Sequence, residues 1–437
     1  MTTLAIAGGE PAIKGVEFPQ WPSVSLQEIQ AVVDLLKKNT LSIYDRSGIY
    51  EIFENNFAKY HGVKYALSHN SGTSALHAAF FATGIGPGDE VLAPTYTFLA
   101  TVMPIFQTGA SPVLCEMNPD TLCIDVNDIE RKITKRSKAI VITHMWGHPC
   151  EMDTIVKLTQ KYNLFLIEDC SHGHGATYNG KKVGTFGDIG CFSLEGHKAV
   201  HAGEGGMFIT DNRHFYERAV MLGHFGKRAK QDVKTIAEKE YIETGLGHKY
   251  RMHPCGATIA NERLKKLDNE NAIRKENMDW FSDRIWNIPG IRPPVTLGNC
   301  TRGGWYGYKP IYIKEELKNL PLVDFINALR AEGVPAKTPG SKPLHLLPLF
   351  QKSSKELAAI GSNYRIYDSQ NIFTYKEGDF PIAEEQYGKL LSFPVFAVEA
   401  QKLLELFAIA IEKVVQNIDQ VFTVINNGKL WNARDSK

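Results

Sequence analysis

Residues 164–206, LFLIEDCSHGHGATYNGKKVGTFGDIGCFSLEGHKAVHAGEGG, decide the expected fold. One apolar run ends in Asp169 and a second carries Ser193, and Lys198 follows before the glycine-rich stretch 203–206. Short apolar runs bounded by Gly, Asp and Ser residues are typical of buried strands. The segment therefore predicts two strands whose ends carry an acid, a hydroxyl and a lysine.

The same pattern continues outward, because short apolar runs alternate with amphipathic stretches from about residue 60 to 215. This alternation predicts an α/β fold with a large, mostly parallel sheet that is covered by helices on both faces. Ligands of such sheets bind at the carboxyl ends of the strands. Strands are predicted at 64–68, 90–94, 111–117, 138–145, 164–169, 189–194 and 206–211, and helices at 74–84, 152–162 and 398–423.

The rest of the chain predicts a second, smaller unit. We expect a large domain at 1–290, including an N-terminal arm, and a small C-terminal α/β domain at 291–437. Residues 351–379 show no strong periodicity, which predicts a long loop or lid. The charged run at 227–240 predicts a solvated face or a mobile loop.

Composition excludes several classes of protein. The 437 residues include 49 Lys and Arg against 48 Asp and Glu, so the near-neutral chain has no long-range attraction for nucleic acid or an anionic membrane. No stretch approaches the roughly 20 apolar residues of a membrane span. The start of the chain lacks an export signal, and the seven cysteines show no C-x-x-C spacing. We therefore expect a cytoplasmic protein with reduced thiols, and neither a nucleic-acid nor a membrane partner.

The polar residues at the strand ends suit pyridoxal phosphate. This cofactor needs a lysine for its aldehyde, an acid for its pyridine nitrogen, an aromatic face and a cradle for its phosphate. Gly72 and Thr73 stand at a predicted helix start, where backbone N–H groups bind phosphate. Tyr96 and Phe98 follow the next strand and offer the aromatic face.

Five motifs in order resemble one enzyme family. SGT-x-AL, P-x-x-TF, ED-x-x-x-x-HGA, FS-x-x-x-x-K and GEGG are similar to motifs of the DegT/StrS-type sugar aminotransferases, a branch of the fold-type-I pyridoxal-phosphate enzymes. The resemblance extends over nearly the whole chain. It implies the fold-type-I transferase architecture, pyridoxal 5'-phosphate as cofactor and transamination as the reaction.

The resemblance also implies a role for individual residues. Lys198 corresponds to the Schiff-base lysine, Asp169 to the partner of the pyridine nitrogen and Phe98 to the stacking aromatic residue. His172, where the family often has Gln, would lie over the cofactor's face or near its phenolic oxygen. The implied phosphate contacts are Gly72, Thr73 and Ser193.

Three features depart from the family's pattern. Leu194-Glu195-Gly196 replaces a common His or Gln, and the segment 351–379 is longer than usual. In the loop 245–254, Lys249 stands where an Asn often reaches the phosphate of a neighbouring subunit. The resemblance implies a homodimer with its active site at the interface, and Lys249 could meet that phosphate as a point charge.

We therefore predict an aminotransferase that moves nitrogen from glutamate or glutamine to a keto-sugar or keto-cyclitol, in secondary-metabolite or surface-sugar biosynthesis. The stretches AGGEP and GLGHKYRMHP favour the branch that acts on cyclitol ketones or forms aminohydroxybenzoate. Three alternatives remain: a dehydratase or aromatising lyase, a non-catalytic cofactor-binding regulator, and a metal enzyme built on Asp169, His172 and His174. Dehydrating members typically have His in place of the lysine, and here His197 precedes Lys198, although the lysine alone falls in register.

Overall fold

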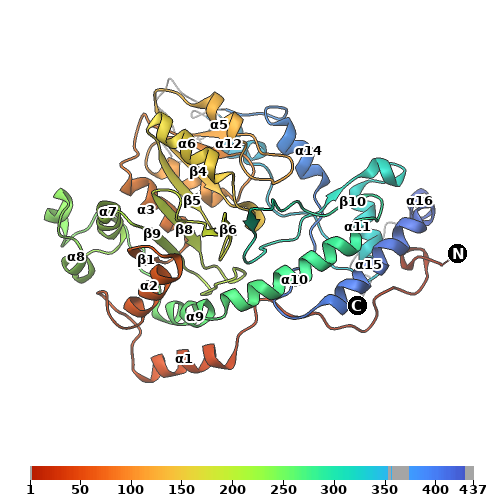
Figure 1. Cartoon of the computed structure of the whole chain (residues 1–437), viewed down its shortest axis with the longest axis horizontal. Coiled ribbons are helices and arrows are strands. Elements are labelled where there is room, and N and C mark those ends of the chain that lie inside the picture. Colours follow the sequence, from red (N-terminus) through yellow and green to blue (C-terminus); the bar gives the residue numbers. More distant parts are fainter. Residues whose placement is uncertain (1, 353–355, 357–373, 429–437) are drawn as a thin grey trace.

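A seven-stranded sheet forms the centre of the computed structural model, which describes residues 2–352, 356 and 374–428 (Figure 1). The strand order is β1-β9-β8-β5-β4-β2-β3. β9 runs antiparallel to both of its neighbours, and the other pairs are parallel. The strands are β1 Tyr65–His69, β2 Glu90–Pro94, β3 Ser111–Cys115, β4 Ser137–Thr143, β5 Phe165–Asp169, β8 Ile189–Ser193 and β9 Gly206–Thr210.

Each of the seven predicted strands is present, and the prediction of a mostly parallel α/β sheet is confirmed. The antiparallel direction of β9 follows from its connection to β8. A parallel neighbour requires a crossover, usually through a helix, whereas residues 194–205 contain no helix and turn the chain back. This turn carries Lys198 at the carboxyl end of β8.

Apolar side chains cover both faces of the sheet. Phe208 packs into one hydrophobic cluster, whereas its strand neighbours Met207 and Ile209 pack into another. Cys191 and Phe192 on β8 divide between the same two clusters. Because successive side chains of a strand point to opposite faces, this alternation shows a sheet that is buried on both sides.

Helices supply the covering layers. α3 is buried along most of its length and packs against β8, β9 and α7, and α2 packs against β1 and α9. The helices of this part of the chain are α1 Leu26–Lys37, α2 Gly48–His61, α3 Gly72–Ala82, α4 Met103–Gln107, α5 Val126–Lys132, α6 Met152–Tyr162, α7 Arg213–Gly223, α8 Lys227–Asp232, α9 Pro254–Leu264 and α10 Leu267–Ile285. A small sheet joins β6 Thr177–Tyr178, β7 Lys181–Lys182 and β11 Cys300–Thr301.

A third hydrophobic cluster joins the C-terminal part to the start of the chain. Leu4 and Ile13 pack into it together with Phe281 of α10, and Figure 1 shows the N-terminal arm running from this region across to α1. The division at residue 290/291 stays a prediction. The elements here are β10 Ile291–Arg292, β12 Ile311–Tyr312, α11 Leu322–Ala331, α12 Pro348–Gln351, α14 Pro381–Lys389, α15 Gln401–Gln416 and α16 Ile418–Asn426.

Two local predictions are wrong. The stretch 398–423 forms the two helices α15 and α16 and not one. The charged run 227–240 is not a solvated face throughout, because Arg228 is 4% exposed and pairs with buried Glu54 at 2.8 Å. Most of the predicted loop 351–379 lies outside the described residues. Within the described part of the chain, no helix is long and apolar enough to cross a membrane.

Candidate active site

Lys198 lies buried in the turn after β8. Its side chain is 7% exposed, and its amine is 3.7 Å from the centre of the Tyr306 ring. Burial lowers the pKa of Lys198 to about 8, although the negative charges of Asp169 and Glu195 partly oppose this shift. Since desolvation disfavours a charged amine, Lys198 has a substantial neutral fraction near neutral pH.

Asp169 ends β5, the strand that pairs with β8. The Oγ1 hydroxyl of Thr101 donates to its Oδ2 at 2.7 Å, and the backbone N–H of Ser171 donates to its Oδ1 at 3.0 Å. Thr101 is itself held by hydroxyl contacts with Thr97 and Thr143, at 2.8 and 3.3 Å. The carboxylate is therefore fixed in place at the carboxyl edge of the sheet.

His172 packs against two aromatic rings above this edge. Its ring stacks on Tyr306 at a centroid distance of 4.0 Å and on Trp146 at 5.3 Å. Burial, and then the positive charges of Lys198 and Lys309, hold the pKa of His172 well below its ordinary value. The backbone N–H of Trp146 donates to Nδ1 at 3.4 Å, so the proton of the neutral ring lies on Nε2.

Gly72, Ser193 and Gly206 bring three chain segments together. A Cβ atom on Gly72, the first residue of α3, would lie 2.8 Å from the Cβ of Ser193 at the end of β8. A Cβ on Gly206 would lie 2.2 Å from the carbonyl oxygen of Ser71. Ser71 caps α3 through reciprocal bonds with Ser74. The absence of side chains here leaves the N–H groups at the start of α3, including that of Thr73, close to Ser193.

These residues fit pyridoxal phosphate. The amine of Lys198 and the carboxylate of Asp169 are buried at the carboxyl ends of the neighbouring strands β8 and β5. The close contact at Gly72 places the N-terminus of α3 beside Ser193. A phosphate, a pyridine nitrogen and an aldehyde each have a matching group in this set.

Phe98 and Lys249 lie at the surface of the single chain. Phe98 is 54% exposed in the loop after β2, and the side chain of Lys249 is also exposed. The loop of Lys249 is tied to the start of α3, because the N–H of Asn70 donates to the carbonyl oxygen of Tyr250 at 2.6 Å. Within one chain, therefore, these two residues do not lie with the buried residues Lys198, Asp169 and His172.

Asp169, His172 and His174 do not form a metal-binding set. His174 donates from Nε2 to the carbonyl oxygen of Ser193 at 2.9 Å, and both carboxylate oxygens of Asp169 are engaged. Among the described residues, the group with suitably close ligand atoms is His144, Glu168 and Cys170.

The carboxylate of Glu168 in that group already has hydrogen-bond partners. Glu168 accepts N–H bonds from Gly184, Phe186 and Gly187, each at 2.7 Å, and His144 bonds to it at 3.1 Å. These bonds account for the acceptor positions of the buried carboxylate, so the cluster stabilises the loop before β8.

Thr101, Trp146 and Tyr306 are contacts that the sequence patterns did not single out. Trp146 follows the carboxyl end of β4, so its place at this edge of the sheet was available as a signal. Thr101 shares the loop after β2 with Phe98. Tyr306 has no local signal, because a distant segment of the chain brings it to Lys198.

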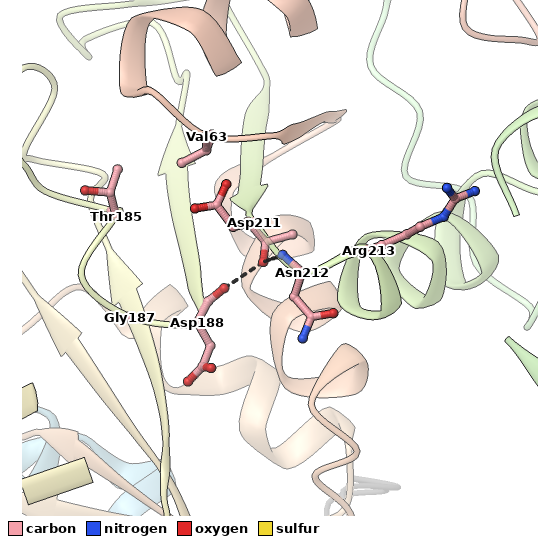
Figure 2. Close-up of a pocket in the computed structure, with 9 residues that line it drawn as sticks. Val63, Thr185, Gly187, Asp188, Asp211, Asn212 and Arg213 are labelled. Carbon is pink, nitrogen blue, oxygen red and sulfur yellow. Dashed lines mark hydrogen bonds between the residues drawn. The ribbon is translucent and has the colours of Figure 1, made fainter. Parts of the chain in front are cut away.

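A separate cavity lies elsewhere. It has a volume of about 500 Å³ and is lined by residues such as Asp188, Asp211 and Arg213 (Figure 2). Asp188 precedes β8 whereas Ser193 ends it, so this cavity is at the opposite edge of the sheet from Lys198. Polar groups that line it already form hydrogen bonds with one another. The Oγ1 hydroxyl of Thr210 donates to the carbonyl oxygen of Asp188 at 2.7 Å, and the backbone N–H of Asn212 donates to the same hydroxyl at 3.1 Å.

Known proteins share this fold and are similar in sequence. The aminotransferase from Psychrobacter cryohalolentis superposes with a TM-score of 0.79 at 28% identity and covers 92% of this chain and 100% of that one. L-glutamine:scyllo-inosose aminotransferase of Streptomyces griseus is 31% identical over 96% of this chain and 99% of the relative. GDP-perosamine synthase of Escherichia coli O157:H7 is 38% identical over 76% and 86% of the two chains.

Fold and site together define a fold-type-I transferase that depends on pyridoxal 5'-phosphate. The model of the DegT/DnrJ/EryC1/StrS aminotransferase family matches residues 22–372. The chain belongs to this family of sugar and cyclitol aminotransferases, and it is a pyridoxal-phosphate-dependent transaminase.

Proposed function

We propose that the chain transfers an amino group from glutamate or glutamine to a keto-sugar or keto-cyclitol, with Lys198 as the residue that binds the cofactor covalently. The observation that carries this proposal is the buried amine of Lys198 beside the fixed carboxylate of Asp169. When bound, pyridoxal phosphate supplies an aldehyde for attachment and a ring that accepts electrons.

Lys198 then serves as the proton carrier. Its pKa of about 8 means that the free amine would be able to accept a proton from the donor's α-carbon and later give it up, as general base and then general acid. Asp169, oriented by Thr101, would hold the protonated pyridine nitrogen through a charge-assisted hydrogen bond.

The remaining residues would bind and orient the cofactor. Gly72, Thr73 and Ser193 would hold the phosphate, and the neutral ring of His172 would lie against one face of the pyridine. Phe98 would cover the other face, and Lys249 of a second copy would reach the phosphate.

The proposed homodimer is supported by the distribution of exposed apolar side chains. Of the eighteen large hydrophobic residues that are exposed in the described part of the chain, eight lie between residues 16 and 52. A second copy that covers this segment and Phe98 would bury them.

The relatives support the acceptor class. One is named for scyllo-inosose, a keto-cyclitol, and another for GDP-perosamine, a nucleotide-linked amino sugar. Glutamine as donor is named for the first of these. We infer a keto-cyclitol or keto-sugar acceptor, in secondary-metabolite or surface-sugar biosynthesis. The seven free thiols support a cytoplasmic location.

A specific observation disfavours the dehydratase alternative. Lys198 is buried in the site, whereas the side chain of His197 is exposed and its carbonyl oxygen accepts a bond from the Trp21 indole at 3.0 Å. An exposed His197 cannot take the lysine's place without rebuilding the turn.

The test is a pair of half-reactions. The cofactor-loaded protein should change its absorbance with L-glutamine or L-glutamate, and the aminated form should return to the starting spectrum with a keto-cyclitol such as scyllo-inosose. Borohydride reduction and peptide mapping should label Lys198. Lys198→Ala should abolish both the label and the half-reactions, and the control Lys181→Ala should retain them, since Lys181 is exposed. A label elsewhere, or an unsaturated product without amine, would contradict the proposal.

A further inference from the structure

Lys309 is a second buried lysine that the proposed reaction does not use. It is 7% exposed, and its amine contacts the Oγ of Ser392 at 2.5 Å and the Trp146 ring at 4.3 Å from the centre. Within the described part of the chain it forms no ion pair. Burial, reinforced by the charge of Lys337, lowers the pKa of Lys309 to about 7. A buried cation without an anion is costly, and such a position favours an anionic ligand.

The side chains beside Lys309 also have unused hydrogen-bonding capacity. The indole Nε1 of Trp146 and the hydroxyl of Tyr96 are buried and lie near each other, but neither forms a hydrogen bond of good geometry with a described residue. Tyr96 is 1% exposed, and its ring lies 6.5 Å from that of Trp146. Since buried polar groups are normally paired, an amine, an indole N–H and a phenol together point to a missing acceptor.

This cluster is continuous with the proposed cofactor site. Trp146 stacks on His172, and the charge of Lys309 contributes to the lowered pKa of that histidine. His172 also stacks on Tyr306, whose ring lies against the amine of Lys198. The three groups therefore adjoin the place where a substrate would react.

The chemistry of the substrates distinguishes the two half-reactions. An amino-acid donor carries a carboxylate next to its amine, whereas a keto-cyclitol carries hydroxyl groups and no charge. A buried cation with neighbouring N–H and O–H donors recognises a carboxylate. We propose that Lys309, with Trp146 and Tyr96, binds the α-carboxylate of the amino-acid donor; this inference rests on the proposed transamination.

The test compares two donors that differ by this one group. L-glutamine carries the α-carboxylate, and 4-aminobutanamide is the same amine without it. The measured quantity is the second-order rate constant of the half-reaction, obtained by rapid mixing as the slope of the observed rate against donor concentration. In the wild type this constant should be far larger for L-glutamine than for 4-aminobutanamide. Lys309→Met should lower that value for L-glutamine about a hundredfold, as expected for a buried charge that loses its partner, and leave it unchanged for 4-aminobutanamide.

Controls separate binding from folding. Lys337→Met removes an exposed charge nearby and should keep the donor preference. Trp146→Phe keeps an aromatic ring but lacks the N–H, and it should lower the half-reaction rate with L-glutamine about tenfold more than the rate with 4-aminobutanamide. This second variant decides the matter if Lys309→Met does not fold.

The outcomes are distinguishable. A wild type that reacts with no amino-acid donor refutes the proposed function. A wild type that reacts normally, with the same donor preference in Lys309→Met, refutes the carboxylate site alone. If Lys309→Met slowed only the half-reaction with a nucleotide-linked acceptor, Lys309 would bind the phosphate groups of that acceptor. This result would also overturn the inference.

Discussion

At the scale of single residues, the reactivity of the site follows from the burial of Lys198. An exposed lysine has a pKa near 10.4 and is almost fully protonated at neutral pH, whereas burial lowers the pKa of Lys198 to about 8. Only a neutral amine attacks an aldehyde or accepts a proton. The fold therefore produces the reactive form of the side chain.

The rate at which the cofactor attaches to the apoprotein should consequently rise with pH up to about 8 and level off above it. With an ordinary lysine pKa, the rate would continue to rise about tenfold for each pH unit up to 10. Absorbance measured after mixing apoprotein with pyridoxal phosphate, at constant ionic strength, gives this profile. A continued rise above pH 9 would contradict the assigned pKa.

Thr101 acts through Asp169. Thr101→Val keeps the shape but removes the 2.7 Å bond to the carboxylate, and we expect kcat to fall about tenfold because hydrogen bonds to charged groups contribute roughly 1.5–3 kcal/mol. Thr143→Val is the comparison variant: it removes a contact that holds Thr101 but not the bond to the carboxylate, so its loss of kcat should be smaller. Steady-state kinetics with glutamine would distinguish the two, and equal losses would argue against a specific role for the Asp169 bond.

At the scale of elements, the start of α3 and the end of β8 approach so closely that one position must be glycine. The Cβ of Gly72→Ala would lie 2.9 Å from the Cα of Ser193, so helix and strand must separate. Overpacking of this kind costs about 1–3 kcal/mol, and we expect a roughly ten- to hundredfold weaker cofactor affinity.

A titration of the apoprotein with pyridoxal phosphate would measure this affinity. Gly86→Ala serves as the control, because the nearest atom to its Cβ would be 4.0 Å away, an ordinary contact. If Gly72→Ala bound the cofactor as well as the wild type, the phosphate would have to lie elsewhere.

At the scale of the whole molecule, the N-terminal segment presents apolar side chains that one chain leaves uncovered. Leu26, the first residue of α1, is 80% exposed. Leu26→Glu suits the helix N-terminus, so the fold should be kept, but the charge would be buried in a dimer interface. We expect at least a tenfold weaker dimer in sedimentation velocity, with activity lost as the chains dissociate.

Val323→Glu is the corresponding control. Val323 is 60% exposed near the start of α11 and is not one of the exposed apolar residues between 16 and 52, so the variant should remain as dimeric as the wild type. A wild type that sediments as a monomer while active would exclude the dimer and, with it, the role of Lys249 at a partner's phosphate.

The sequence by itself determined the strands of the central sheet and the order of its motifs. Local periodicity reports burial along a strand, and polar residues at strand ends meet at one edge of a parallel sheet. That is why Asp169, Ser193 and Lys198 could be placed together before any contact was known, whereas their chemical roles stay predictions.

Only the tertiary structure decided what surrounds those residues. Thr101, Tyr306, Trp146 and Lys309 come from separate segments, and no periodicity records which of them meet. The same holds for Arg228, whose charged neighbours predict a solvated face although it pairs with buried Glu54. Hydrogen-bond partners, desolvation and shifted pKa values depend on contacts between distant segments, and these exist only once the chain has folded.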